Sequence, residues 1–475
     1  MKHGSPKSLF AAPLEGEFLT RDEARALAGR VLAFAKADET RVNIQTGWTG
    51  NTRFAGNEIT TSGGTTNTSI TVTSTIGRRR ASSATNVLDD ASLRRTVEFA
   101  ESLARLSPEN PELAAELGPQ EYATVNGYFD STAGLDAEKR ATATKSAIDA
   151  AEKAGGPGAN IFVAGYLEAN AGASAVATSR GLFAYHRSSS ANLGITARTP
   201  DGTGSGWSNA GARDWSVIDA AALGRTASEK AAASRNPRPI EPGLYTVVLE
   251  PAAVSDIMGS LFGTFNARGN DEGRGTYSKP GGGTKLGEKI ADQRVTMYSD
   301  PADADLLAQP FAQDGTPVRR VTYIENGILK EFAYDRFWAQ KQGKTATGGG
   351  GGGFGGGGGG GGGFGGGAVK FVGGTKTTAE LIAGTKRGIL VTHFFYIRPL
   401  DQRTVMLTGL TRDGTFLIEN GKITAAVKNF RWNESPLFLL SKIDEIGRAE
   451  PVGAGRVMPS LRATDFNFSS LSDAV

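Results

Sequence analysis

The amino-acid sequence predicts an α+β protein. Its N-terminal α/β region should carry helices on a mostly antiparallel sheet, and its C-terminal domain should be a β-rich barrel or sandwich. Three observations predict this class. Segments with helical apolar spacing flank segments of alternating polarity in the first half of the chain. Three prolines within 236–243 then mark a linker. Beyond the linker, hairpin signals replace helical ones.

The chain has 475 residues, which is too long for one hydrophobic core and suggests several domains. Composition and pattern shifts divide it into five parts. These are an N-terminal tail (1–19), a βα sub-domain (20–110), a second α+β sub-domain (120–235), a β-rich C-terminal domain (240–475) and, inside the last, a glycine tract (348–367). The tract contains only glycine and two phenylalanines, so we expect a disordered or mobile loop there.

The N-terminal elements follow from spacing. Thr20 and Glu23 form a capping box, and the helix they begin has an apolar stripe. Alternating polarity predicts half-buried strands, and apolar spacing predicts further helices. The expected strands are 42–46, 68–76, 160–167, 173–178, 181–188 and 191–199, and the further helices are 90–106, 136–154 and 219–235.

Turn chemistry dominates the C-terminal domain. The sequence Ile-Glu-Asn-Gly occurs at 324–327 and again at 418–421, each time between alternating apolar residues. Asn-Gly favours the type I′ turn, which needs positive φ at both central residues, so we predict two β-hairpins. Asp413-Gly414 is interpreted as another such turn.

Composition excludes several classes of function. The net charge is +3, and no clustered basic face is visible, which argues against nucleic-acid binding. No segment has the apolar length of a signal peptide or a membrane span, so we expect a cytoplasmic protein. The chain has no cysteine and only three histidines, His3, His186 and His393. The chain therefore has few of the side chains that usually bind zinc.

The stretch YTVVLEPAAVSDIMGSLF, residues 245–262, predicts a strand that leads directly into a helix. Val247, Val248 and Leu249 form the apolar strand, and Pro251 suits a first helical position. Enzymes often place reactive groups at such junctions. Its polar candidates are Glu250, Ser255 and Asp256.

Other candidates could line a cavity or contact a peptide. Asp271, Glu272 and Arg274 could line a cavity, although a solvated turn is the alternative. The spacing of Tyr334, Arg336 and Trp338 places them on one face of a strand that could line a groove, with core packing as the alternative for the aromatic residues. His393 is grouped with Tyr396 and Arg398 as a peptide-contacting face, and His186 is expected to be structural. The full set of cavity or peptide candidates is Asp256, Asp271, Glu272, Arg274, Tyr334, Arg336, His393, Tyr396 and Arg398.

Several long strings resemble one family. They are GWTGNTRFAGNEITTSGGTTNTSITV, SRGLFAYHRSSSANLGITARTPDGTGSGW, EKAAASRNPRPIEPGLYTVVLEPAAVSDIM, DEGRGTYSKPGGGTKLGEKI, LTGLTRDGTFLIENGKITAAVKNFRWNESPLFLL and DFNFSSLSDAV. They resemble the TldD/PmbA family, which is also called "modulator of DNA gyrase" and treated as a metallopeptidase family. The likeness is closer to the PmbA (TldE) branch, and it implies a dimer around a central cavity.

The resemblance also implies where a metal should bind. In the TldD branch the strand-to-helix junction carries His-Glu-x-x-x-His, in which two histidines bind zinc, the glutamate is the general base, and a later cysteine completes the site. Here Glu250, Pro251 and Ser255 stand at those three positions. Proline cannot accept a proton, and a serine hydroxyl is a poor zinc ligand. We therefore expect no catalytic residue and no metal ligand in this chain.

Three functions stay open at this point. The first is a zinc-free subunit of a two-component peptidase that pairs with a TldD-like, zinc-bearing subunit and binds peptides or unfolded proteins. The second is a homodimeric peptide-binding or scaffold protein without catalysis. The third is a metal-independent hydrolase that uses Glu250 and Asp256.

Overall fold

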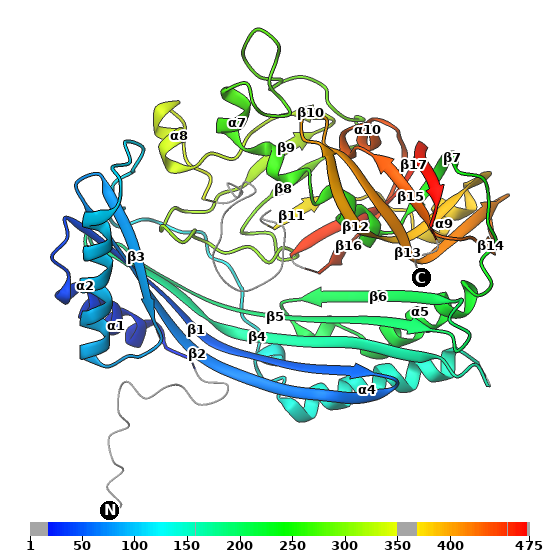
Figure 1. The fold of residues 1–475 in the computed structure, drawn as a ribbon, viewed down its shortest axis with the longest axis horizontal. Helices are drawn as coiled ribbons and strands as arrows, with labels where there is room; N and C mark the ends of the chain where they lie inside the picture. Colours follow the sequence, from blue (N-terminus) through cyan, green and yellow to red (C-terminus); the bar gives the residue numbers. More distant parts are fainter. Residues whose placement is uncertain (1–17, 157, 349–367, 454, 473–475) are drawn as a thin grey trace, which may run out of the picture.

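A six-stranded antiparallel sheet forms the N-terminal half of the protein, as the computed structural model shows (Figure 1). The structure describes residues 18–156, 158–348, 368–453 and 455–472. The strand order is β3-β2-β1-β4-β5-β6. The strands are β1 (Glu39–Ala55), β2 (Glu58–Ile76), β3 (Arg79–Thr85), β4 (Phe162–Thr178), β5 (Phe183–Arg198) and β6 (Ser205–Ala212). The two N-terminal sub-domains therefore contribute three strands each to one sheet.

Helices cover one face of this sheet. They are α1 (Arg21–Phe34), α2 (Asp90–Leu106), α3 (Asp130–Ala133), α4 (Ala137–Ala154) and α5 (Ala220–Ala233). Apolar residues of α1 and α2 pack with those of β1, β2 and β4, and residues of α4 and α5 pack with β4 and β5. The predicted capping box is confirmed, because Thr20 and Glu23 bond reciprocally at the start of α1.

The sheet strands are longer than the sequence indicated. The predicted segments 160–167 and 173–178 fall in one strand, β4, from Phe162 on, and 181–188 and 191–199 fall in one strand, β5, between Phe183 and Arg198. Small residues in the middle of these strands obscured the alternation. Gly47 and Gly172, for example, face each other so closely that a Cβ on either would lie within 3 Å of the neighbouring backbone.

The C-terminal half is β-rich, as predicted, but its sheet is mixed. Among the described residues it has eleven strands, and β7 pairs with β12 in parallel and with β17 antiparallel. The strands are β7 (Gly243–Leu249), β8 (Met297–Ser299), β9 (Val321–Glu325), β10 (Ile328–Leu329), β11 (Val369–Phe371), β12 (Arg387–Asp401), β13 (Met406–Glu419), β14 (Lys422–Ala426), β15 (Phe430–Glu434), β16 (Ile443–Val452) and β17 (Arg456–Leu471).

Short helices complete this half. They are α6 (Pro251–Met258), α7 (Ala267–Asp271), α8 (Arg336–Lys341), α9 (Thr378–Ala383) and α10 (Pro436–Ser441). Both Asn-Gly hairpins are confirmed, β9–β10 at Asn326 and β13–β14 at Asn420, each with positive φ. Most of the glycine tract lies outside the described residues. No helix in the described part of the chain has both the length and the apolar character needed to cross a membrane.

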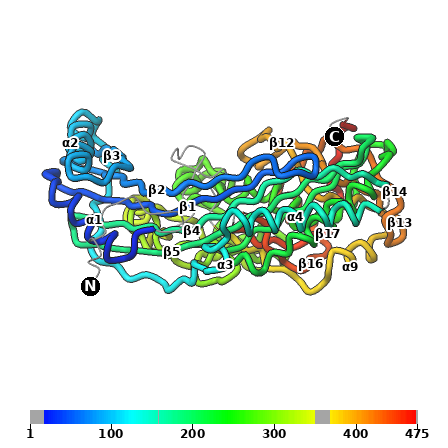
Figure 2. The backbone as a smooth tube through the Cα atoms, turned by 90° about the horizontal axis from the view of Figure 1, so that it is seen from below, coloured from blue at the N-terminus to red at the C-terminus, as the bar shows by residue number. Residues whose placement is uncertain are grey.

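The C-terminal half lies over the sheet face that the helices leave open (Figures 1 and 2). A connecting segment, residues 107–129, contains no helix or strand and runs between the two halves. Its Glu112 pairs with Arg268 of α7, at 2.6 Å from Oε2 to Nη1. Its Tyr122 hydroxyl donates to the Gly315 carbonyl at 2.8 Å.

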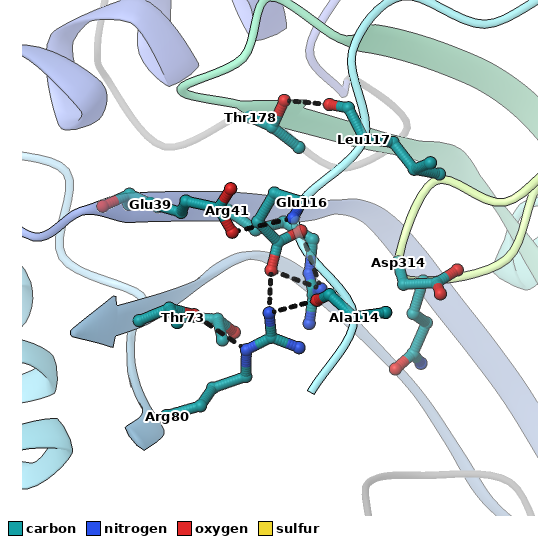
Figure 3. Close-up of polar contacts among 12 residues, drawn as sticks. Glu39, Arg41, Thr73, Arg80, Ala114, Glu116, Leu117, Thr178 and Asp314 are labelled. Atoms are coloured by element: carbon teal, nitrogen blue, oxygen red, sulfur yellow. Dashed lines mark hydrogen bonds and ion pairs between the residues drawn. The ribbon is translucent and has the colours of Figure 1, made fainter. Parts of the chain in front are cut away.

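Glu116 anchors the same segment to the sheet (Figure 3). Its side chain is fully buried and accepts hydrogen bonds at 3.0 and 3.1 Å from Arg41 of β1. Arg80 of β3 lies 3.1 Å from the same carboxylate. Removing the carboxylate would leave two partly buried guanidinium groups without their anion, which is the costly way to break such a pair.

We expect Glu116→Ala to lower the free energy of unfolding by about 3 kcal/mol. Glu109→Ala is the matched control, because the Glu109–Arg79 pair is exposed and spans 3.4 Å. Its cost should stay below about 1 kcal/mol. Guanidinium unfolding followed by tryptophan fluorescence measures both. Equal costs for the two variants would contradict the anchoring role of Glu116.

Candidate functional site

The predicted strand-to-helix junction is confirmed. Strand β7 ends at Leu249, Glu250 is the N-cap residue of α6, and Pro251 occupies the first turn. The apolar stripe of α6, including Val254, Ile257 and Met258, is completely buried in the C-terminal core. This packing fixes the helix, so the polar side chains at positions 250, 255 and 256 have defined surroundings.

A cation from the N-terminal half contacts the first of these positions. Lys230 of α5 places its Nζ 2.6 Å from Oε2 of Glu250. Each of the two side chains is only about one-fifth exposed. The Glu250 carboxylate is therefore neutralised by a lysine, and the ion pair links α5 to the start of α6.

A second cation contacts Ser255. Arg456, at the start of β17, donates from Nη1 to the Ser255 carbonyl at 3.3 Å and lies 3.4 Å from its hydroxyl. The same guanidinium lies over the ring of Phe262, 5.4 Å from the ring centre. Burial lowers the pKa of Arg456, with Asp256 acting in the opposite direction. An arginine nevertheless stays protonated under these conditions.

Asp256 of α6 is the first of three ionisable side chains that lie in a row, followed by His393 of β12 and Asp413 of β13. Oδ2 of Asp256 accepts the Phe394 backbone N–H at 2.9 Å and lies 3.8 Å from Nδ1 of His393. The other ring nitrogen of His393, Nε2, lies 2.9 Å from Oδ2 of Asp413. Burial raises the pKa of Asp256 to about 6, and His393 opposes this effect.

The row ends on the N-terminal sheet. Ser205 of β6 donates a hydrogen bond to Asp413, and Trp207 of β6 packs against His393 with the rings tilted by 32° and their centres 4.7 Å apart. Burial disfavours the Asp413 carboxylate, but the hydrogen bonds from His393 and Ser205 outweigh burial and lower its pKa. The cluster of Asp256, His393, Asp413, Ser205 and Trp207 therefore connects the two halves.

The prediction of a turn at Asp413-Gly414 is wrong. Both residues lie inside β13 and have positive φ, 53° and 123°. The register between β12 and β13 shifts here, between Val391 and His393, as in a β-bulge. Asp-Gly is common in tight turns because both residues tolerate positive φ. A β-bulge of this kind needs positive φ as well, so the same dipeptide fits either structure. The bulge places Asp413 against His393.

The residues at this junction do not fit a zinc ion. A zinc site needs three or four nitrogen, sulfur or carboxylate ligands around one point. Here the one carboxylate at a family ligand position is paired with Lys230, and the serine faces Arg456. Among the described residues, no group of three His, Asp or Glu side chains could hold a metal ion. Two cations close to the junction would also repel a third.

The remaining candidate residues lie elsewhere. Asp271 accepts a hydrogen bond from the Trp338 indole at 2.7 Å. Glu272 pairs with Arg268 at 2.9 Å and with Arg274, so this acidic turn is occupied by its own ion pairs. The hydrogen bonds of Asp271, Glu272 and Arg274 are made to neighbouring residues and to Trp338, and not to the strand-to-helix junction.

The common face assigned to Tyr334, Arg336 and Trp338 is wrong, because Asp335 caps a helix, α8, that begins at Arg336. Tyr334 is buried, and Arg336 donates to the Ala115 carbonyl of the connecting segment. The common face of His393, Tyr396 and Arg398 is wrong for His393 alone, because Tyr396 and Arg398 contact each other. Register shifts separate them along β12, so that His393 is enclosed while Tyr396 is 56% exposed, with Arg398 over its ring.

The sheet face that looks toward the C-terminal half is polar. Its central strands carry small hydroxyl, amide and glycine residues, and a cavity of about 250 Å³ opens over them. Residues that line it include Gln45, Thr49, Asn67, Asn170, Ser174, Ser188 and Gln309. His186 lies beside this face, buried, and burial lowers its pKa to about 4. The sequence suggested a hydrogen-bonded structural role, but Nε2 of His186 is buried without a hydrogen-bond partner among the described residues.

A family model described as the PmbA/TldA metallopeptidase C-terminal domain matches residues 242–470, and the corresponding central-domain model matches residues 132–235. The chain belongs to the PmbA/TldD family. Two solved structures have the same fold as this PmbA/TldD protein. One is a Thermotoga maritima protein described as a modulator of a DNA gyrase, with a TM-score of 0.81 and 20% identity over 94% of this chain and 99% of that one. The other is TldE from Thermococcus kodakarensis, with a TM-score of 0.81, 19% identity and the same coverage.

Curated relatives match over shorter stretches. An uncharacterised protein of Methanocaldococcus jannaschii is 31% identical over 104 residues, which is 22% of this chain and 24% of that protein. A metalloprotease of Archaeoglobus fulgidus is 36% identical over 62 residues, 13% of this chain and 15% of that protein. A Buchnera aphidicola metalloprotease TldD homolog is 25% identical over 163 residues, 34% of this chain and 33% of that protein. The PmbA/TldD protein thus spans a third or less of the curated relatives it matches.

We expect Asp256→Asn to change the pH dependence of stability. Folding raises the pKa of the Asp256 carboxyl group, so this group contributes its full stabilisation below the pKa of the unfolded state, near 4. The contribution is lost as pH rises through the pKa of the folded state, about 6. The free energy of unfolding of the wild type should therefore fall relative to Asp256→Asn between pH 4 and pH 7. Because about a third of the side chain is solvent-exposed, we expect on the order of 1 kcal/mol. Parallel curves for the two proteins would contradict the raised pKa.

Proposed function

We propose that this PmbA/TldD protein is a zinc-free subunit that acts with a TldD-like, zinc-bearing subunit in the hydrolysis of peptides or unfolded proteins. One observation carries the proposal: Lys230 and Arg456 occupy the junction at which the resemblance expects zinc ligands. A chain with this junction needs another polypeptide to supply the metal. The names of its relatives, TldE and metalloprotease TldD homolog, support a role in the same system.

The part assigned to this chain is to hold the substrate. The open sheet face presents neutral hydrogen-bonding side chains and few apolar ones around the 250 Å³ cavity. Such a surface suits the main-chain amides of an extended peptide, which are the same in every sequence, better than particular side chains. Tyr396 and Arg398 remain candidate peptide contacts, whereas His393 is enclosed by Asp413 and Trp207. A cytoplasmic location likewise remains a prediction.

Metal content and activity test the proposal together. The purified chain should contain much less than one zinc per molecule by mass spectrometry, and it should leave an unstructured peptide uncleaved. Adding a TldD-like subunit from the same host, one that carries His-Glu-x-x-x-His, should produce cleavage. One tightly bound zinc and peptidase activity from the chain alone would contradict the proposal.

The two alternative functions give different results. If the chain purifies from its host without any TldD-like subunit, and the mixture stays inactive, the homodimeric binding or scaffold function is favoured. A metal-independent hydrolase would cleave the peptide alone, and Glu250→Ala together with Asp256→Ala would abolish the cleavage. The Lys230–Glu250 ion pair argues against this third function, because it withdraws one of the two carboxylates.

A further inference from the structure

Four side chains of the β12–β13 hairpin form a cluster beside the junction. Phe395, Tyr396 and Arg398 come from β12. Arg412 comes from β13, directly opposite His393. The guanidinium carbon of Arg412 lies 4.1 Å from the centre of the Phe395 ring. That of Arg398 lies 4.2 Å from the centre of the Tyr396 ring, and the two ring centres are 6.2 Å apart. We call these four residues the arginine–aromatic cluster.

An irregular backbone brings both aromatic rings to the surface. In a regular strand, Phe395 and Tyr396 would point to opposite faces of the sheet. The register of β12 against β13 instead shifts between Phe395 and Arg398, and Tyr396 has a φ of 54°. Phe395 and Tyr396 are 44% and 56% exposed, and their rings are neighbours. Bulges and positive φ at a bulky residue both concentrate near binding sites, where they re-aim side chains.

The hairpin carries more positive than negative charge. Between Phe395 and Arg412, both included, it has three arginines and one acidic residue, Asp401. Asp401 accepts hydrogen bonds from the backbone N–H and the hydroxyl of Thr404, at 2.8 and 2.5 Å. The same two groups hold the pKa of Asp401 below its usual range. This carboxylate therefore serves its own turn, and the hairpin is a local cationic site.

Neither stacked arginine has an anion of its own. Arg398 donates from Nη1 to the Ile397 carbonyl at 2.9 Å, and it forms no ion pair with any residue in the described ranges. Nε of Arg412 lies 3.6 Å from Asp413, but that carboxylate is shared with His393. A guanidinium above an aromatic ring is attracted by the ring face, while its N–H groups point outward around its rim. Both arginines can therefore donate further hydrogen bonds.

These features fit a carboxylate group. Two N–H groups of a guanidinium match the two oxygens of a carboxylate, and the charges make these bonds stronger than neutral ones. The rings beneath the guanidiniums limit their motion, so less entropy is lost when a ligand binds. Nucleic acid also carries anionic groups, but it needs a longer basic face than three arginines on one hairpin provide. A peptide carboxylate is the better match.

The arginine–aromatic cluster adjoins the sheet face assigned to the peptide. Ser208 of β6 donates to the Leu223 carbonyl of α5, so Trp207, one residue earlier, points to the opposite, open face. His393 packs against Trp207, and Phe395 follows His393 by two residues on β12 (orange in Figure 1). The cluster therefore begins within two residues of the boundary between β12 and the open face.

We propose that the arginine–aromatic cluster binds a carboxylate of the peptide, either an acidic side chain or the free C-terminus. The proposal rests on the proposed peptide-holding role and adds the class of substrate to it. Carboxylate binding at this cluster involves neither zinc nor a second subunit, so the chain alone can be tested.

Isothermal titration calorimetry of the full-length chain with three N-acetylated peptides tests the proposal. The peptides share one unstructured Gly-Ser-Ala sequence. The first contains two glutamates and has an amidated C-terminus. The second has a free C-terminal carboxylate and no acidic side chain, and the third is neutral. At least one carboxylate-bearing peptide should bind at least about tenfold more tightly than the neutral one, and the tighter of the two identifies the source of the carboxylate.

Variants of exposed arginines on the same hairpin separate the cluster from general charge. Arg398→Gln should weaken the preferred peptide at least about fivefold and leave the neutral peptide unchanged. Arg398→Lys keeps the charge but loses the paired N–H groups, so most of the preference should be lost as well. Arg403→Gln is the matched control, because Arg403 is exposed and lies over no aromatic ring in the described part of the chain. It should change the affinity less than about twofold.

Equal affinity of the wild type for all three peptides would overturn the proposal. Full affinity in Arg398→Lys, or a loss in Arg403→Gln as large as that in Arg398→Gln, would overturn it too. So would a single-stranded oligonucleotide that binds more tightly than the acidic peptide at physiological salt. The zinc-free subunit role fails by a different result, namely zinc binding and cleavage by the chain alone, so the two failures are distinguishable.

Discussion

Two cations, Lys230 and Arg456, pair with the strand-to-helix junction, and the proposed zinc-free role depends on this pairing. Lys230 neutralises Glu250, and Arg456 donates to Ser255, so the two positions at which the resemblance expects zinc-binding histidines have a positive charge nearby. Both cations come from elements outside the junction, α5 and β17, and their removal would leave polar groups buried without partners. The Lys230–Glu250 pair therefore also joins the two halves of the protein, and both contacts oppose the binding of a metal.

The cluster around His393 shows how the two halves are joined. A bulge in β13 turns Asp413 toward the imidazole, Asp256 approaches from α6, and Ser205 and Trp207 contribute from the N-terminal sheet. Each group depends on the others, because an isolated buried carboxylate or imidazole would favour its neutral form. The cluster spans both halves, so its contacts help to hold them together.

Sequence reasoning was most successful where interactions are local. The capping box at Thr20, the Asn-Gly hairpins and the start of α6 at Pro251 each depend on neighbours a few residues apart. It failed where tertiary contacts decide. Arg456 follows Ser255 by 201 residues and Lys230 precedes Glu250 by 20, so no spacing rule links them. Asp413-Gly414 carried a correct signal for positive φ, but only the pairing of β12 with β13 distinguishes a bulge from a turn.

Zinc titration of histidine-restored variants tests the central claim most directly. Glu250→His with Ser255→His supplies two imidazoles but keeps Arg456, whereas a second protein adds Arg456→Ala. If the nearby cation closes the junction to metal, the second protein should bind zinc at least about tenfold more tightly, because each 1.4 kcal/mol of repulsion removed is a factor of ten. Equal affinities in the two proteins, or tight zinc binding by the unaltered chain, would contradict the account.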